Sequence, residues 1–262
     1  MIYLPEEIQK RIAEQEYAID EIGMSDSTVI MFEDSVLKIQ SETLETQGEI
    51  KMLQWLEGKL PVPKVLSHVT ENGKSYLLMS RMDGQMACEE KYLENPKLLA
   101  SVLAQSMKKL WEIDVTTCPV RMDLDVKLRM ARENIKNGLV DMDNVEPDTF
   151  GENGFKGPDE LLQWLVANKP EEELVLSHGD YCLPNIFIKE EALAGYIDLG
   201  RMGIADKWVD IAICYRSLLH NYAGKYTGKV YDGVDSNLLF EELGIEPDWN
   251  KIRYYILLDE LF

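Results

Sequence analysis

Long hydrophobic runs are absent from this sequence of 262 residues, since no stretch approaches the roughly 18 apolar residues that a membrane-spanning helix needs. The opening residues contain no basic region followed by an apolar one, so we expect no secretory signal. The four cysteines form no CxxC pair and have no histidine cluster beside them: Cys88, Cys118, Cys182 and Cys214. This spacing argues against a disulfide framework and a zinc site, and it predicts reduced thiols in a cytoplasmic protein.

Basic residues are also scarce, with 27 Lys and Arg against 47 Asp and Glu, for a net charge of −20. Nucleic acids and anionic membrane surfaces repel such a chain, so we expect neither as a partner. The charge permits a polycationic partner, although solubility alone would also explain it. Hydrophobic residues make up 45% of the chain, which is enough for a sizeable core. We expect a monomer or a weak dimer.

The pattern of apolar residues changes character near residue 84. Ahead of it we expect a short amphipathic helix in PEEIQKRIAEQ near the start, and then a β-hairpin, a second helix and two further strands, at residues 27–40, 45–57, 62–69 and 75–79. Beyond it we expect four helices, at residues 95–110, 159–167, 205–222 and 251–261, and two short strands, at 186–188 and 195–197. The sequence therefore predicts an α+β fold with two lobes, a β-rich one followed by a mainly helical one, with a hinge at residues 80–84.

The residues most suggestive of chemistry lie in SHGDYCLPN and the following GYIDLGR. Asp180 is followed five positions later by Asn185, and Asp198 follows a predicted β-hairpin. Phosphoryl transfer needs a group that orients the attacking hydroxyl and oxygen ligands that hold Mg²⁺ on the phosphates. Asp180 suits the first task, and Asn185 with Asp198 suits the second. His178 is too close to Asp180 in sequence for a catalytic triad, so we expect it to brace this segment.

These motifs resemble those of the protein-kinase-like antibiotic kinases, specifically the aminoglycoside 3′-phosphotransferases. The resemblance covers nearly the whole chain and rests on HGD-x4-N, IDLGR, ADKW and the ending LLDELF, and it is greatest to the type III enzyme of Gram-positive cocci. It implies a bilobal kinase-like fold, with a nucleotide-binding lobe at 1–83 and a catalytic and substrate-binding lobe at 84–262. It also implies ATP and Mg²⁺ as cofactors and a cationic aminoglycoside as substrate.

The resemblance assigns roles in nucleotide binding residue by residue. Asp180 matches the catalytic aspartate, and Asn185 and Asp198 match the magnesium ligands. Lys38 matches the lysine that contacts the α- and β-phosphates, and Glu49 matches its ion-pair partner. Three further positions match a loop over the β-phosphate and hinge groups that bond the adenine: Ser25, Ser80 and Met82.

The substrate side is implied in the same way. Residues 141–152 hold five carboxylates and no basic residue, and they match the acidic antibiotic-binding loop of the family, with Asp141, Glu146 and Asp148 as candidate ligands. Four more positions match substrate-site residues: Arg201, Arg216, Glu260 and Phe262. A run of carboxylates is otherwise typical of a solvated surface.

Two departures from the family leave alternatives open. Val36 stands where the family usually stacks an aromatic ring on adenine, and the segment 220–239 is longer than in the type III enzyme, with His220 replacing a glutamate. The expected reaction is transfer of the γ-phosphate of ATP to the 3′-hydroxyl of kanamycin- or neomycin-type antibiotics. The alternatives are a kinase of another small cation such as choline, and a kinase-like binding module without turnover.

Overall fold

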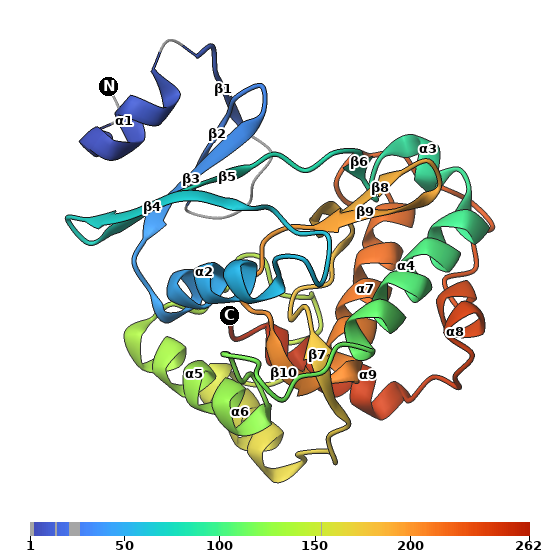
Figure 1. Ribbon diagram of the computed structural model, residues 1–262. Coiled ribbons are helices and arrows are strands. Elements are labelled where there is room, and N and C mark those ends of the chain that lie inside the picture. The colour runs from blue at the N-terminus through green and yellow to red at the C-terminus, as the bar shows by residue number, and fades with distance from the viewer. Residues whose placement is uncertain (1–2, 14, 21–26, 153) are drawn as a thin grey trace.

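The first part of the chain forms an antiparallel sheet of five strands, seen at the upper left of Figure 1. The structure is a computed structural model, and it describes residues 3–13, 15–20, 27–152 and 154–262. The strands are β1 Ala18–Asp20, β2 Thr28–Met31, β3 Ser35–Ser41, β4 Val65–Glu71 and β5 Lys74–Ser80, in the spatial order β1-β2-β3-β5-β4. Asn72 and Gly73 form the turn between β4 and β5, and both have positive φ angles (53° and 73°).

Two helices belong to this part, α1 Glu6–Ile12 and α2 Leu44–Leu56. A capping box starts α2: the Thr46 N–H donates to the Thr43 hydroxyl (3.2 Å), and the Thr43 N–H donates to the Thr46 hydroxyl (2.9 Å). Ile8 of α1 packs into a small core on the sheet. Met52 of α2 belongs instead to the main core of the molecule, so α2 joins the sheet to the helical part of the chain.

The remainder of the chain is mainly helical and occupies the right and the bottom of Figure 1. Its helices are α3 Glu90–Leu93, α4 Pro96–Trp111, α5 Leu124–Asn137, α6 Pro158–Ala167, α7 Lys207–Tyr222, α8 Leu238–Leu243 and α9 Trp249–Asp259. Its strands form two small sheets, one of β7 Leu174–Ser177 with β10 Gly203–Asp206, the other of β6 Gln85–Met86, β8 Ile186–Lys189 and β9 Ala192–Tyr196.

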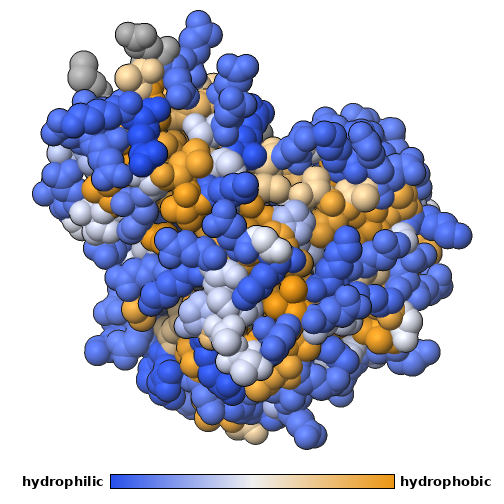
Figure 2. Space-filling model, viewed as in Figure 1, coloured by the Kyte–Doolittle hydropathy of each residue, from blue (hydrophilic) through white to orange (hydrophobic). Residues whose placement is uncertain are grey.

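The main core lies between these helices and the small sheets. Two large fully buried tyrosines lie in it and direct their hydroxyls to backbone carbonyls of α4, Tyr181 to Leu103 (3.1 Å) and Tyr196 to Ser106 (2.8 Å). Tyr181 follows Asp180, and Tyr196 ends β9 two positions before Asp198. These two hydrogen bonds therefore attach the segments that carry Asp180 and Asp198 to α4. Hydrophilic residues cover most of the face in Figure 2, and hydrophobic residues show in the hollow between the sheet and the helices.

The α+β fold expected from the sequence is confirmed. The predicted hairpin at 27–40 corresponds to β2 and β3, and the predicted helix at 45–57 to α2. The helix predicted to begin at 205 begins at Lys207, because Asp206 caps it by accepting a hydrogen bond from the Trp208 N–H. Helix α5 was not predicted. The division of the lobes at residues 83 and 84 stays a prediction.

None of the helices in the described part of the chain combines the length and the hydropathy that crossing a membrane requires.

Candidate active site

The segment that carries Asp180 connects β7 to β8 and is held in place by Asp210, a fully buried residue of α7. The Asp210 carboxylate accepts three hydrogen bonds of 2.9 Å, from the Ser177 hydroxyl and from the backbone N–H groups of His178 and Gly179. Burial raises the pKa of Asp210, while these donors favour its ionised form. Asp210 therefore fixes the backbone immediately before Asp180.

Only glycine fits at position 179. Its φ angle is +83°, and a Cβ atom there would collide with the backbone carbonyl of Arg201. The Asp180 segment and the segment after Asp198 are therefore in direct backbone contact. The buried His178 makes a second connection between them, because its Nε2 lies 3.0 Å from the Ile197 carbonyl oxygen. His178 thus braces the segment, as the sequence predicted.

Asn185 lies beside Asp180, at the end of the short 3₁₀ helix η1 Leu183–Asn185. Its Nδ2 donates to the Asp180 Oδ2 and to the Asp180 backbone carbonyl, both at 3.0 Å. Its own backbone carbonyl accepts from the Ile197 N–H (3.0 Å), next to Asp198. Residues from three positions in the sequence, 180, 185 and 198, therefore meet at one place.

Lys38 of β3 reaches this place from the five-stranded sheet. Its Nζ donates to the Glu49 Oε2 of α2 (3.1 Å) and to the Asp198 Oδ1 (2.9 Å). Burial lowers the pKa of Lys38, but the two carboxylates outweigh burial and raise it above its usual value. Lys38 therefore stays charged, and its ammonium joins both parts of the molecule at the site.

Asp198 has features expected of a ligand for a cation. Its side chain is 45% exposed although it is paired with Lys38, and its φ of +58° is unusual for a residue other than glycine. Among the described residues no group of three or more His, Cys, Asp or Glu side chains could hold a metal ion by itself. The Asn185 Nδ2 is engaged by Asp180, so the Oδ1 is the atom of this amide that would suit a cation. An oxygen pair of this kind suits Mg²⁺ that takes its other ligands from phosphates and water.

A second group of charges lies where α9 ends. Asp259 binds two arginines: it accepts from the Arg201 Nη1 (3.3 Å) and from the Arg216 Nη2. Arg216 also donates to the Glu260 Oε1 (3.2 Å), and the Glu146 N–H donates to the Glu260 Oε2 (2.9 Å). Burial raises the pKa of Glu260 to about 7, despite the nearby Arg216. This chain of contacts ties the acidic loop to the carboxyl-terminal helix.

Phe262, the last residue, lies against the same group, because the Arg201 guanidinium stands 5.4 Å from the centre of its ring. The ammonium of Lys127, a buried residue of α5, stands 5.8 Å from that same ring centre. In Figure 1 the carboxyl terminus lies beneath α2. Arg201 reaches α2 as well, with its Nε 3.6 Å from the Glu45 Oε1. The end of the chain is therefore enclosed by cations from two separate elements.

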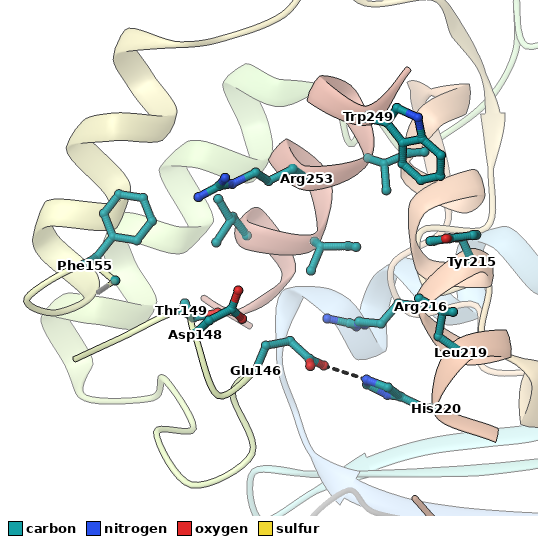
Figure 3. A pocket seen from close by; sticks show the side chains of 14 residues that line it. Glu146, Asp148, Thr149, Phe155, Tyr215, Arg216, Leu219, His220, Trp249 and Arg253 are labelled. Carbon is teal, nitrogen blue, oxygen red and sulfur yellow. Dashed lines mark ion pairs between the residues drawn. The ribbon is translucent and has the colours of Figure 1, made fainter. Parts of the chain in front are cut away.

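A cavity of about 540 Å³ opens beside this group, between the acidic loop, α7 and α9. Figure 3 shows Glu146, Asp148 and Arg216 in its lining, with Tyr215 and Trp249 at one end. Three of the predicted substrate residues, Glu146, Asp148 and Arg216, therefore line one cavity, and their role stays a prediction. Asp141 is placed differently, since its carboxylate accepts from Asp143 and Asn144 within its own loop.

The adenine positions stay predictions. Ser80 ends β5, and its N–H donates to the Lys64 carbonyl (2.9 Å), while the Met82 side chain lies against Gly195 of β9. Val36 is half-buried in β3 and pairs across the sheet with Met79. Ser25 lies outside the described residues.

Sequence reasoning missed three residues of this region: Asp210, Asp259 and Lys127. Asp210 stands in VDIA, directly after the ADKW motif, and Asp259 stands in LLDELF. The sequence does not say which backbone groups Asp210 binds or which arginines Asp259 binds. Lys127 carries no signal in the sequence, since a lysine in a polar helix is normally solvated.

Comparison with known proteins shows the family to which the chain belongs. A family model described as the phosphotransferase enzyme family matches residues 23–241. An aminoglycoside 3′-phosphotransferase of Enterococcus faecalis is 42% identical, over 92% of this chain and 87% of its own length. One of Staphylococcus aureus is 40% identical, over 98% of this chain and 97% of its own. The crystal structure of an aminoglycoside-3′-phosphotransferase of type VIII superposes with a TM-score of 0.82 at 25% identity, covering 98% of this chain and 97% of that one.

Proposed function

The chain belongs to the aminoglycoside 3′-phosphotransferases, and we propose that it transfers the γ-phosphate of ATP to the 3′-hydroxyl of a cationic antibiotic of the kanamycin or neomycin type. Such a reaction would confer resistance on its host. The four cysteines are unpaired, in keeping with the cytoplasmic location that we propose.

Lys38 is the residue that would contact the phosphates. It is held in place by Glu49 and reaches Asp198, so its charge stands where the two parts of the molecule meet. Asn185 and Asp198 would hold Mg²⁺. When bound, the ion would neutralise charge on the phosphates. In this arrangement Lys38 exchanges part of its contact with Asp198 for a phosphate oxygen, while Glu49 keeps it oriented.

Asp180 would accept the proton of the attacking hydroxyl. Its Oδ2 already accepts from the Asn185 amide (3.0 Å), which would hold the carboxylate in place while it orients the substrate. Asp210 and His178 hold the backbone around it, so the carboxylate is positioned before the substrate arrives. Positioning of this kind is the main contribution that a protein makes to phosphoryl transfer.

The antibiotic would lie between the acidic loop and the end of α9. Glu146, Asp148 and Glu260 supply carboxylates there for ammonium groups, and Arg201 and Arg216 hold the carboxylates of this region in place. We place Phe262 and Asp141 at the edges of this site. The chain needs no nucleic acid for this activity, and we propose that it acts as a monomer or a weak dimer.

One observation supports the proposal more than any other, the contact between Lys38 and Asp198. The two residues are 160 positions apart and come from different parts of the fold, yet their charged atoms lie 2.9 Å from each other, beside the Asp180 and Asn185 pair. A merely structural ion pair would not need a carboxylate that is 45% exposed and adopts a positive φ.

Turnover with a panel of acceptors tests the proposal. Purified protein with saturating MgATP should release ADP in the presence of kanamycin or neomycin, and the product should carry phosphate on the 3′-hydroxyl. Turnover with choline and none with the antibiotics would replace the proposal by a metabolite kinase. Binding of ATP without turnover of any acceptor would leave a kinase-like binding module.

A further inference from the structure

The acidic loop meets basic side chains at one carboxylate, that of Glu146. The His220 Nε2 lies 2.9 Å from the Glu146 Oε1, a pair drawn as a dashed line in Figure 3, and the Lys225 Nζ lies 3.7 Å from the same oxygen. The Glu146 side chain is 22% exposed. Asp141, in contrast, is exposed and accepts its hydrogen bonds from its own loop.

Lys225 is held at this position by the segment that follows α7. Its N–H donates to the His220 carbonyl (3.0 Å), and its Nζ lies 3.5 Å from the His220 Nδ1. Gly224 permits this turn with a φ of +74°, and a Cβ there would come 2.9 Å from the Lys229 carbonyl oxygen. The Tyr226 hydroxyl, 3.2 Å from the His220 Nδ1, completes the group.

Of the two basic side chains nearest to Glu146, Lys225 supplies the positive charge and His220 does not. Burial lowers the pKa of His220, and the Lys225 and Arg216 cations lower it further, which outweighs the attraction of Glu146. The imidazole is therefore mainly neutral at pH 7, and it acts as a hydrogen-bond partner between Glu146 and the following segment.

We propose that Lys225, oriented by His220, occupies the Glu146 carboxylate as an internal competitor of the antibiotic, so that a substrate ammonium group must displace it. The segment from His220 to Tyr226 thereby determines specificity: it penalises substrates that rely on Glu146 and spares those that bind through Glu260 and Asp148. This inference rests on the proposed function.

The direction of the effect separates this role from a structural one. If Lys225 only held Glu146 in place for the substrate, removing its charge would weaken binding. If it competes, Lys225→Met should lower the KM for neomycin about two- to fivefold, the factor that one partly exposed ion pair corresponds to. The KM for ATP should stay unchanged, because ATP is bound through Lys38.

Lys229 offers a matched control in the same segment. Its ammonium donates to Glu90 of α3 and to Glu94, the residue that follows α3 (2.8 Å), away from Glu146. Lys229→Met removes the same charge and should leave the neomycin KM as it is. A decrease equal to that of Lys225→Met would overturn the proposal, since general charge would then be responsible.

A double-mutant cycle with Glu146→Gln tests the mechanism directly. Lys225→Met should have no effect on the neomycin KM once Glu146 is neutral. An unchanged or raised KM in the single variant, or a decrease that persists beside Glu146→Gln, contradicts the inference.

Calorimetric titration of neomycin into the protein without ATP supplies a readout that needs no turnover. Lys225→Met could bind neomycin more tightly than the unchanged protein while neither protein turns over an antibiotic. That result would uphold the inference and overturn the proposed function. Equal or weaker binding by the variant, or no binding by any protein, overturns the inference.

Discussion

Changing Asp210 to asparagine removes the charge from the side chain that holds the backbone before Asp180. The carboxylate accepts the Ser177 hydroxyl and the Gly179 N–H on one oxygen and the His178 N–H on the other. In Asp210→Asn the amide oxygen can still accept from the Ser177 hydroxyl and the Gly179 N–H. Its NH₂ group then faces the His178 N–H, so that one buried donor loses its acceptor.

The expected loss of stability can be worked out from this geometry. A hydrogen bond to a charged group contributes about 1.5–3 kcal/mol, and the unpaired N–H adds a desolvation cost, so the free energy of unfolding should fall by about 2–4 kcal/mol. For a chain of this size that corresponds to a decrease in Tm of roughly 5–15 °C. A displacement of the Asp180 carboxylate by about 1 Å can lower kcat on the order of 10²-fold.

Asp206→Asn is the matched control. Asp206 is also a buried carboxylate, four positions before Asp210, and it accepts from the Tyr255 hydroxyl (2.7 Å) and the Lys251 ammonium (3.1 Å), away from Asp180. This variant should lose a similar amount of stability and keep its kcat. Thermal unfolding and steady-state kinetics well below both Tm values compare the two variants. An undiminished kcat in Asp210→Asn, or an equal loss in both variants, would refute the positioning role.

Three further predictions concern the reacting groups. Asp180→Asn should lower turnover on the order of 10²-fold or more while MgATP still binds, and near-normal turnover would remove Asp180 from the mechanism. Asp198→Ala should abolish Mg²⁺-dependent nucleotide binding in a titration in which Glu190→Ala, a change outside the motif, has little effect; equal losses would point to general charge. Because the pKa of Glu260 is raised to about 7, its ionised form gains population as the pH rises through that value. The antibiotic KM should therefore fall between about pH 6 and 8, and a Glu260→Gln variant that keeps the same pH profile would contradict this.

Local patterns in the sequence are sufficient for most elements of the fold. The Asn72-Gly73 turn and the cap at Asn95 are local, because each fixes only its own neighbours in the chain. Helix α5 was missed although Asp123 caps its start and Gly138, with a φ of +66°, ends it. Its sequence is mostly polar, and its apolar face, which includes Leu124 and Leu128, becomes evident only when it packs against the core.

The site can be predicted as far as its residues belong to a motif. Asp180, Asn185 and Asp198 stand in the two motifs of the sequence, and the structure brings them together. Asp210 could not be assigned, because its partners lie between 31 and 33 positions away and two of them are backbone N–H groups, which nearly every residue possesses. The arginine partners of Asp259 lie still farther away in sequence, at 58 and 43 positions.

Asp259, one of the residues that sequence reasoning missed, connects the segment that carries Asp180 to the acidic loop. The Arg201 carbonyl packs against Gly179, next to Asp180, and the Arg201 guanidinium binds Asp259. Through Arg216 and Glu260 the same contacts continue to the Glu146 backbone in the acidic loop. Because ion pairs that are largely shielded from solvent tolerate the loss of one partner poorly, a change of Asp259 should alter the position of Asp180 as well as that of the acidic loop. The carboxyl-terminal helix is thus connected to the segment that carries Asp180, through the two arginines that Asp259 holds.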